Sequence, residues 1–157
     1  MTTINGLPAH ALLVHFIVVL APLTAVLAIA CAVWRPARQR LVWLVFTLSI
    51  VTSVLTPITT QAGEWLEHRS GRSPLLHAHT ELGDTMIYFS LSLVLAALLL
   101  AVVHIRETRG QSMNAVALWA VAIVVIIASV ATTVQVYRIG DSGAKSVWAQ
   151  DADGQAP

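Results

Sequence analysis

The chain has 157 residues, of which 57% are hydrophobic and only 11% are charged, and its mean hydropathy is +0.76. So few charged side chains cannot cover a water-soluble domain of this size, which argues against a soluble enzyme. The formal net charge of +1 does not point to a nucleic-acid partner. Because Cys31 is the single cysteine, an intramolecular disulfide, a cysteine-based zinc site and a c-type haem attachment motif are excluded.

The charged residues form patches that separate four long uncharged runs, over 1–34, 41–63, 85–105 and 110–137. A bilayer core of about 30 Å needs about 20 apolar helical residues to cross it, and each run is long enough. The sequence therefore predicts an all-α integral membrane four-helix bundle, a single membrane domain over 1–157. We expect the spans at about 8–34, 41–61, 75–105 and 114–138, followed by a tail over 139–157.

Proline and capping residues predict where the helices begin. Pro8 suits the first turn of the first helix. Ser73 can cap a third helix that starts at Pro74 and runs unbroken to about Arg106. Asn114 can cap the fourth helix in the same way.

Glycines predict where the fourth helix ends. Gly140 lies just past the fourth span and is a natural C-terminal cap. Gly143 then allows a turn that brings Trp148 back to the membrane interface. Either the tail forms a lid over the end of the bundle, or it is only an anchored tail.

Basic residues near the span ends predict the orientation. The side with the loops at 35–40 and 106–109 carries five arginines against one acid, namely Arg35, Arg38, Arg40, Arg106 and Arg109 against Glu107. The opposite side, with both termini, carries four basic residues against seven acidic ones. We therefore expect both termini to be extracytoplasmic. The first run lacks the basic segment of a secretory signal peptide, so we expect it to remain as a span.

Polar residues from all four spans collect at the level of the termini. They are His10 and His15; Thr52, Ser53, Thr56, Thr59, Thr60 and Gln61; His77, His79, Thr80, Glu81 and Asp84; and Ser129, Thr132, Thr133, Gln135 and Tyr137. Lipid offers no hydrogen-bond partners, so these groups must face protein, water or a ligand. This common level is the strongest indication of a functional site.

The preferred hypothesis is a b-type haem with imidazoles from two helices as axial ligands, in a membrane electron-transfer system. His15 and His79 are the best ligand pair, and Met86 is a weaker candidate. Gly83 lies one helical turn from His79 and leaves room for a flat group. The stripe that contains Thr56 and Thr60 could supply the facing wall.

Other readings of the same residues stay open. A transition-metal ion could be bound by imidazoles and a carboxylate drawn from His10, His15, His79, Glu64 and Glu81. A proton or small-solute pathway needs no cofactor. Alternatively, the chain is a non-catalytic membrane subunit or scaffold, in which His15 bonds Thr56 or Thr60 only to hold the helices together.

The sequence carries no motif for nucleophilic catalysis or phosphate binding. We therefore do not expect the chain to be an enzyme on its own, although the sequence leaves this open. His68 and His104 are expected to be surface loop residues without a role.

Four segments carry a family resemblance: "LPAHALLVHFIVVLAPLTAVLAI" (7–29), "TTQAGEWLEH" (59–68), "HTELGDTM" (79–86) and "VYRIGDSGAKSVW" (136–148). In order and spacing they resemble the small bacterial four-span membrane proteins of domain of unknown function 2231. The resemblance implies a multi-pass protein of the bacterial cytoplasmic (inner) membrane. Some members are joined to Rieske or cytochrome-type domains, which implies an electron-transfer setting.

By motif, the resemblance singles out His10, His15 and His79, and Gly140, Asp141 and Gly143 after the fourth span. Family members often have proline after the first of these histidines, where this chain has Ala11, a change expected to affect helix entry more than chemistry. No fused redox domain is present in this chain, so the resemblance implies a separate redox protein as partner, besides the lipid bilayer.

Overall fold

The computed structural model describes the backbone of residues 3–4, 7–70, 74–111 and 113–152, and the side chains of 12–65, 74–111 and 113–146. Within these residues the elements are β1 (Thr3–Ile4), β2 (Leu7–Pro8), α1 (Ala9–Val33), α2 (Arg35–Ser70), α3 (Pro74–Asp84), α4 (Met86–Thr108) and α5 (Ala115–Ala152). β1 and β2 form an antiparallel pair in which Ile4 lies opposite Leu7. Pro8 therefore ends a strand instead of opening the first helix as predicted.

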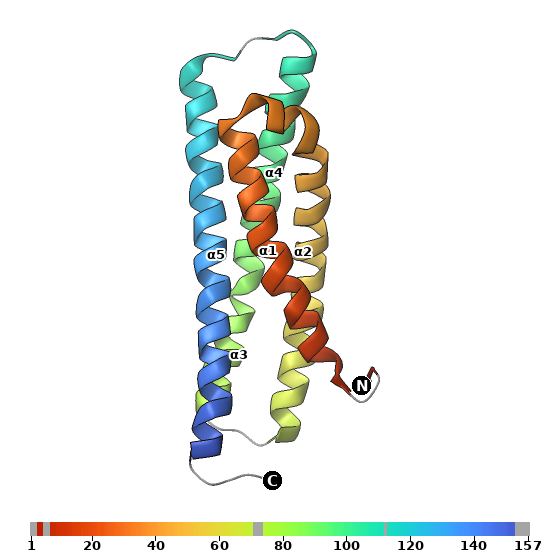
Figure 1. The fold of residues 1–157 in the computed structure, drawn as a ribbon, viewed down its shortest axis with the longest axis vertical. Helices are drawn as coiled ribbons and strands as arrows, with labels where there is room; N and C mark the ends of the chain where they lie inside the picture. The colour runs from red at the N-terminus through yellow and green to blue at the C-terminus, as the bar shows by residue number, and fades with distance from the viewer. Residues whose placement is uncertain (1–2, 5–6, 71–73, 112, 153–157) are drawn as a thin grey trace.

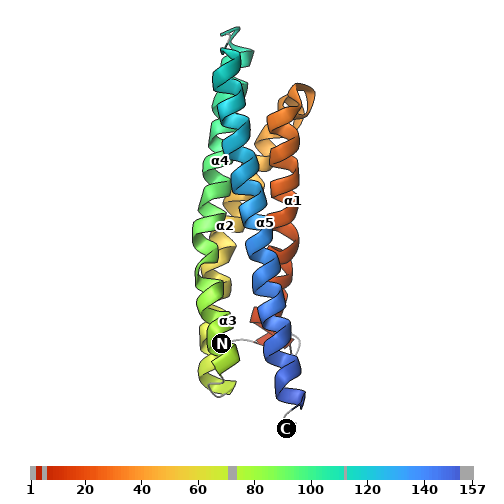
Figure 2. The same ribbon diagram turned by 90° about the vertical axis from the view of Figure 1, so that its left-hand side faces the viewer.

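The long helices form a bundle in which α1 and α4 each pack against α2 and α5 (Figures 1 and 2). The order around the bundle is thus α1, α2, α4, α5, and α3 extends the α4 side between α2 and α5. Both termini lie at one end, which we call the terminal end. At the other end α1 joins α2 and α4 joins α5. We call it the basic end, since it carries the five arginines and Glu107.

The distribution of side chains is that of a membrane protein. Many buried positions hold small or hydroxyl residues such as Ala21, Thr24 and Ser90, while many large apolar residues, such as Phe16 and Val19, are exposed. Small residues let helix backbones approach closely, and exposed apolar side chains suit contact with lipid. Four stretches of the described chain are long and apolar enough to span a membrane: Leu12–Val33, Arg35–Trp65, Pro74–Thr108 and Ala115–Ser146. This confirms the predicted all-α bundle with four membrane-spanning helices.

A single residue, Trp34, separates α1 from α2. α1 stops at Val33 and α2 starts at Arg35, with Pro36 in the first turn of α2, where its missing N–H costs no helix hydrogen bond. The predicted loop at 35–40 is therefore wrong, since these residues form the first turns of α2. This turn brings Arg38 back against the end of α1.

The predicted third helix is broken at Thr85 into α3 and α4. The Thr85 hydroxyl bonds the Leu82 carbonyl at 2.6 Å, and the Gln135 amide of α5 donates to the Thr85 hydroxyl at 2.7 Å. A polar side chain from another helix thus accompanies the break. The predicted cap Ser73 lies outside the described residues.

The last helix extends far beyond the predicted span. As predicted, Asn114 caps it, with its side-chain oxygen accepting from Ala117 N–H at 2.7 Å. The predicted stop at Gly140 and turn at Gly143 are wrong, because α5 runs through both to Ala152. The tertiary contacts of this extension, described below, favour helix over local glycine preference. The side chain of Trp148 lies outside the described residues.

Candidate functional site

A cavity of 630 Å³ lies toward the terminal end of the bundle, and we call it the terminal cavity. Its lining comes from all the helices: Val14, His15, Ile17 and Val18 of α1; Thr56, Thr59, Thr60 and Gly63 of α2; Leu76, His79, Thr80, Gly83 and Asp84 of α3; Met86 of α4; and Val136, Ile139, Gly140, Gly143 and Ala144 of α5. The walls are mainly apolar, with a few polar groups. Cofactor and small-molecule sites generally have this composition and a volume of about 300–1,000 Å³.

The terminal cavity brings together every residue predicted for a flat cofactor, namely His15, Thr56, Thr60, His79, Gly83 and Met86. The helical phase of α3 accounts for part of this, because Gly83 follows His79 by one turn on the same face, while Met86 begins α4. At Gly83 no described atom lies within 4 Å of the position a Cβ would occupy. The space predicted beside this glycine is therefore present.

A polar contact from α5 holds His79 in the terminal cavity. Its Nδ1 lies 2.8 Å from Ser142 Oγ on α5, and the Ser142 hydroxyl donates to the Ile139 carbonyl at 2.9 Å. Since the hydroxyl hydrogen is used in that bond, Oγ accepts from the imidazole Nδ1–H. In the neutral ring this leaves the lone pair on Nε2, the nitrogen that can bind a metal or accept a proton.

Gly143 provides the room for the His79 ring. A Cβ at position 143 would lie 3.0 Å from His79 Cε1 and 3.4 Å from Nδ1. The extension of α5 thus holds the imidazole by two features one residue apart, the Ser142 hydroxyl and the bare Gly143 backbone. Sequence reasoning missed Ser142, because α5 was expected to end before it.

The facing walls come from α1 and α2. His15 of α1 lines the cavity but is an exposed residue, which places it at the rim and not in the bundle interior. On α2 the Thr56 hydroxyl donates to the Thr52 carbonyl at 2.8 Å and the Thr60 hydroxyl to the Pro57 carbonyl at 3.2 Å. These threonines therefore present oxygen lone pairs to the cavity as acceptors.

The described residues give no support to a metal centre of three or more ligands. Among them, no such group of His, Cys, Asp and Glu side chains lies close enough to hold an ion. Glu81 is exposed and pairs with His77 on its own helix, with His77 Nε2 and Glu81 Oε1 3.5 Å apart. Glu64 is exposed, and the side chain of His10 lies outside the described residues.

Next to the terminal cavity, polar bonds join α5 to α3 and α4. Buried Gln135 donates to the Thr85 hydroxyl at 2.7 Å and to the Leu82 carbonyl at 3.4 Å. One helical turn away, the hydroxyl of buried Thr132 donates to the Ala128 carbonyl of its own helix at 2.8 Å and also lies 3.2 Å from the Phe89 carbonyl of α4. These bonds fix α5 in register with the α3–α4 break.

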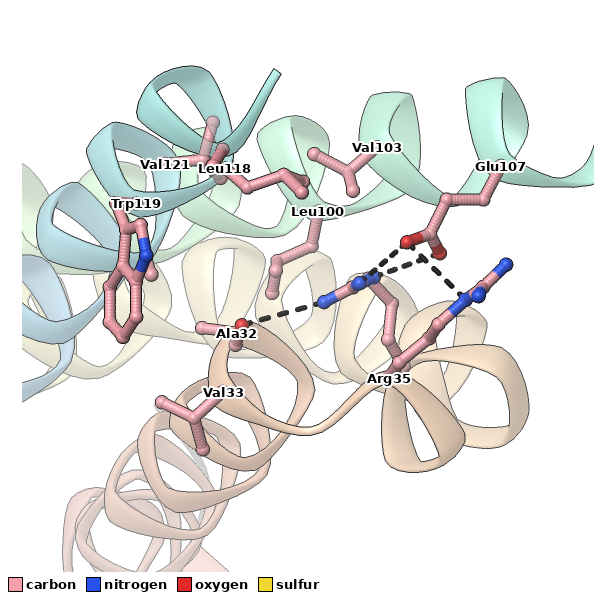
Figure 3. Close-up of a pocket in the computed structure, with 12 residues that line it drawn as sticks. Ala32, Val33, Arg35, Leu100, Val103, Glu107, Leu118, Trp119 and Val121 are labelled. Carbon is pink, nitrogen blue, oxygen red and sulfur yellow. Dashed lines mark hydrogen bonds and ion pairs between the residues drawn. The ribbon is translucent and has the colours of Figure 1, made fainter. Parts of the chain in front are cut away.

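At the basic end, Arg38 and Glu107 form a buried ion pair that sequence reasoning did not predict. Arg38 is 6% exposed and binds both carboxylate oxygens, with Nη2–Oε1 at 2.7 Å and Nε–Oε2 at 3.2 Å. Its Nη1 also donates to the carbonyls of Cys31 and Ala32 at the end of α1, at 2.7 and 3.4 Å. Figure 3 shows Glu107 facing Arg35 across the same region. The available signal was that Glu107 is the lone acid among the arginines of this end.

His104 is placed differently from the prediction. It lies within α4, not in a loop, and is partly buried. Its ring meets Trp43 edge-on at a centroid distance of 6.2 Å. Its Nδ1 is buried with no hydrogen-bond partner among the described residues.

The comparisons agree with the membrane architecture. No curated protein and no solved structure matches this chain. One family model, described as a predicted membrane protein (DUF2231), matches residues 6–154, nearly the whole length. This match includes all four spans, the terminal cavity and the Arg38–Glu107 pair. The chain therefore belongs to the DUF2231 family of predicted membrane proteins.

Proposed function

We propose that this membrane protein binds a haem b in the terminal cavity, with His79 as the principal axial ligand and His15 as the second. The observation that carries the proposal is the 2.8 Å contact between His79 Nδ1 and Ser142 Oγ. Metal-ligating histidines generally donate their other ring N–H to a hydrogen-bond acceptor, which orients the ring and raises its basicity. Ser142 does this for His79, because its Oγ accepts from Nδ1–H at 2.8 Å.

The shape of the terminal cavity supports a flat, largely apolar ligand. The open space beside Gly83 lies one helical turn from His79. Met86 and Val136 are buried apolar residues of the same lining. The ring of such a ligand could therefore lie along α3 with its apolar faces against these side chains. His15 at the rim of α1 comes from a different helix, as a second axial ligand requires.

When bound, haem b would supply one-electron transfer. The protein would hold His79 in one tautomer and keep water away from the apolar faces of the haem. It would also leave one edge of the haem near the membrane surface. We propose a separate redox protein as electron partner. The expected setting is the bacterial cytoplasmic membrane.

The absorption spectrum of protein purified from haem-replete cells tests the proposal. We expect a Soret band that is lost in His79→Ala and reduced in His15→Ala. His77→Ala is the matched control, since His77 is exposed on the same helix and does not line the cavity. The proposal would be overturned if the purified protein showed no Soret band and if haem titration produced no band of protein-bound haem. Equal Soret bands in His79→Ala and His77→Ala would also overturn it.

A second candidate is a non-catalytic membrane scaffold, and the Gln135 contacts favour it. Those bonds join helices without involving the cavity lining, so polar residues at this level also serve packing alone. In that case His79→Ala would lower the free energy of unfolding and change no spectrum. Measuring both properties on the same variant separates the two candidates.

A further inference from the structure

A second hollow lies at the basic end, 390 Å³ in volume, which we call the basic groove. It is bounded by the end of α1, the start of α2, the end of α4 and the start of α5. One side holds the charged residues Arg35, Arg38 and Glu107, and the other is apolar. Figure 3 shows Arg35 and Glu107 on one side and Val33 and Trp119 on the other. The groove thus separates a charged end from an apolar end.

The charges of the basic groove do not cancel. Arg38 is occupied, because its guanidinium bonds both Glu107 oxygens and two carbonyls of α1. Arg35 is different: its side chain is 64% exposed, and its Nε lies 3.7 Å from a Glu107 oxygen that Arg38 already binds. Two guanidinium groups against one carboxylate leave one positive charge. That charge lies on Arg35, the more exposed of the two.

The apolar side of the basic groove opens toward lipid. Val33 is 62% exposed and Trp119 is 67% exposed, and both lie on spans that are apolar enough to cross the membrane. Leu118 and Val121 continue the apolar wall along α5. An occupant must therefore have an anionic head for Arg35 and hydrocarbon for the α1–α5 wall.

We propose that the basic groove binds an anionic phospholipid, with its phosphate on Arg35 and an acyl chain along Val33, Leu118 and Trp119. Charge complementarity favours this occupant, because the basic end carries five arginines against one acid. Basic pockets between membrane helices bind anionic headgroups, and one Lys or Arg at the headgroup strengthens such binding about fivefold. This proposal is independent of the haem proposal, since the two sites lie at opposite ends of the bundle.

Native mass spectrometry of the delipidated full chain in detergent tests the proposal. The probe is an equimolar mixture of phosphatidylglycerol and phosphatidylcholine with identical acyl chains. We expect phosphatidylglycerol to be bound about fivefold better. Arg35→Gln should bring the two lipids near parity. Arg40→Gln should keep the preference, because Arg40 is exposed on the same helix outside the groove.

A second variant tests the apolar side without changing charge. Ala115 lines the groove and is exposed, so Ala115→Leu fills space without forcing a side chain into the core. We expect it to weaken binding of both lipids, with the circular dichroism spectrum unchanged. Equal binding of the two lipids by the unmodified chain, or equal losses in Arg35→Gln and Arg40→Gln, would overturn the proposal. So would unchanged binding in Ala115→Leu, or displacement of the lipid by inorganic phosphate at constant ionic strength.

Discussion

At the basic end of the bundle, Arg38 and Glu107 bind each other and the last carbonyls of α1. At the terminal end, His15, His79 and a stripe of threonines line a cavity of 630 Å³. The first arrangement uses its polar groups within the protein, whereas the second presents them to a space. Buried polar groups generally bond one another when their role is structural. The difference is that Arg38 and Glu107 join α2 to α4 directly, whereas the polar groups of the terminal end line the cavity that we propose for a haem.

The largest expected loss of unfolding free energy comes from removing Arg38 at the basic end. Arg38→Met leaves the Glu107 carboxylate, whose side chain is 14% exposed, without its bidentate partner. Removing one member of a buried ion pair lowers the free energy of unfolding by about 3–5 kcal/mol, and the exposed Arg35, whose Nε lies 3.7 Å from Glu107 Oε1, replaces only part of the lost pairing. The loss should appear in an SDS unfolding titration of the bicelle-reconstituted chain.

Two controls make this result specific. Arg40→Met removes an exposed arginine of the same helix and should change the unfolding free energy by less than about 0.5 kcal/mol. The double variant Arg38→Met/Glu107→Leu removes both charges and should recover most of the loss. A double variant as unstable as Arg38→Met would contradict the interpretation that the unpaired carboxylate is the cause.

The next effect concerns the helix contacts beside the terminal cavity. Gln135→Leu removes the bonds to the Thr85 hydroxyl and the Leu82 carbonyl, and should lower the unfolding free energy by about 1 kcal/mol. Thr133→Val is the control, because the Thr133 hydroxyl bonds the Ser129 carbonyl of its own helix. The same SDS titration measures both variants. If Gln135→Leu does not exceed Thr133→Val, these bonds do not hold α5 to the α3–α4 break.

The sequence was sufficient for the features that depend on local pattern. Four spans follow from the positions of the charges, and the common face of His79 and Gly83 follows from helical phase. Pairings between distant residues were not predictable in this way. Arg38 and Glu107 are 69 residues apart, and they meet only because α2 starts at Arg35 without a loop.

The end of α5 was mispredicted for a related reason. Gly140 and Gly143 have the local preference of helix-ending residues, so the sequence indicated a stop. The structure instead continues the helix, with Ser142 bonded to His79 and Lys145 paired with Asp141 at 2.6 Å. The contact with α3 lies 63 residues away along the chain, so no local rule reveals it.

The smallest expected changes in the free energy of unfolding come from alanine substitutions at these two glycines. Comparing the two variants tests whether Gly143 positions the His79 ring. Alanine within a helix is more favourable than glycine by about 0.5–1 kcal/mol. Gly140→Ala should show this gain, because no described atom lies within 4 Å of the new Cβ. Gly143→Ala should not show this stabilisation, because its Cβ would lie 3.0 Å from His79 Cε1 and the imidazole ring would have to move. The ¹⁵N resonance of His79 Nδ1 should keep its protonated shift in Gly140→Ala and move in Gly143→Ala. Equal stabilisation with unmoved resonances in both variants would mean that Gly143 does not position the ring. The Ser142 contact would then hold His79 without help from Gly143.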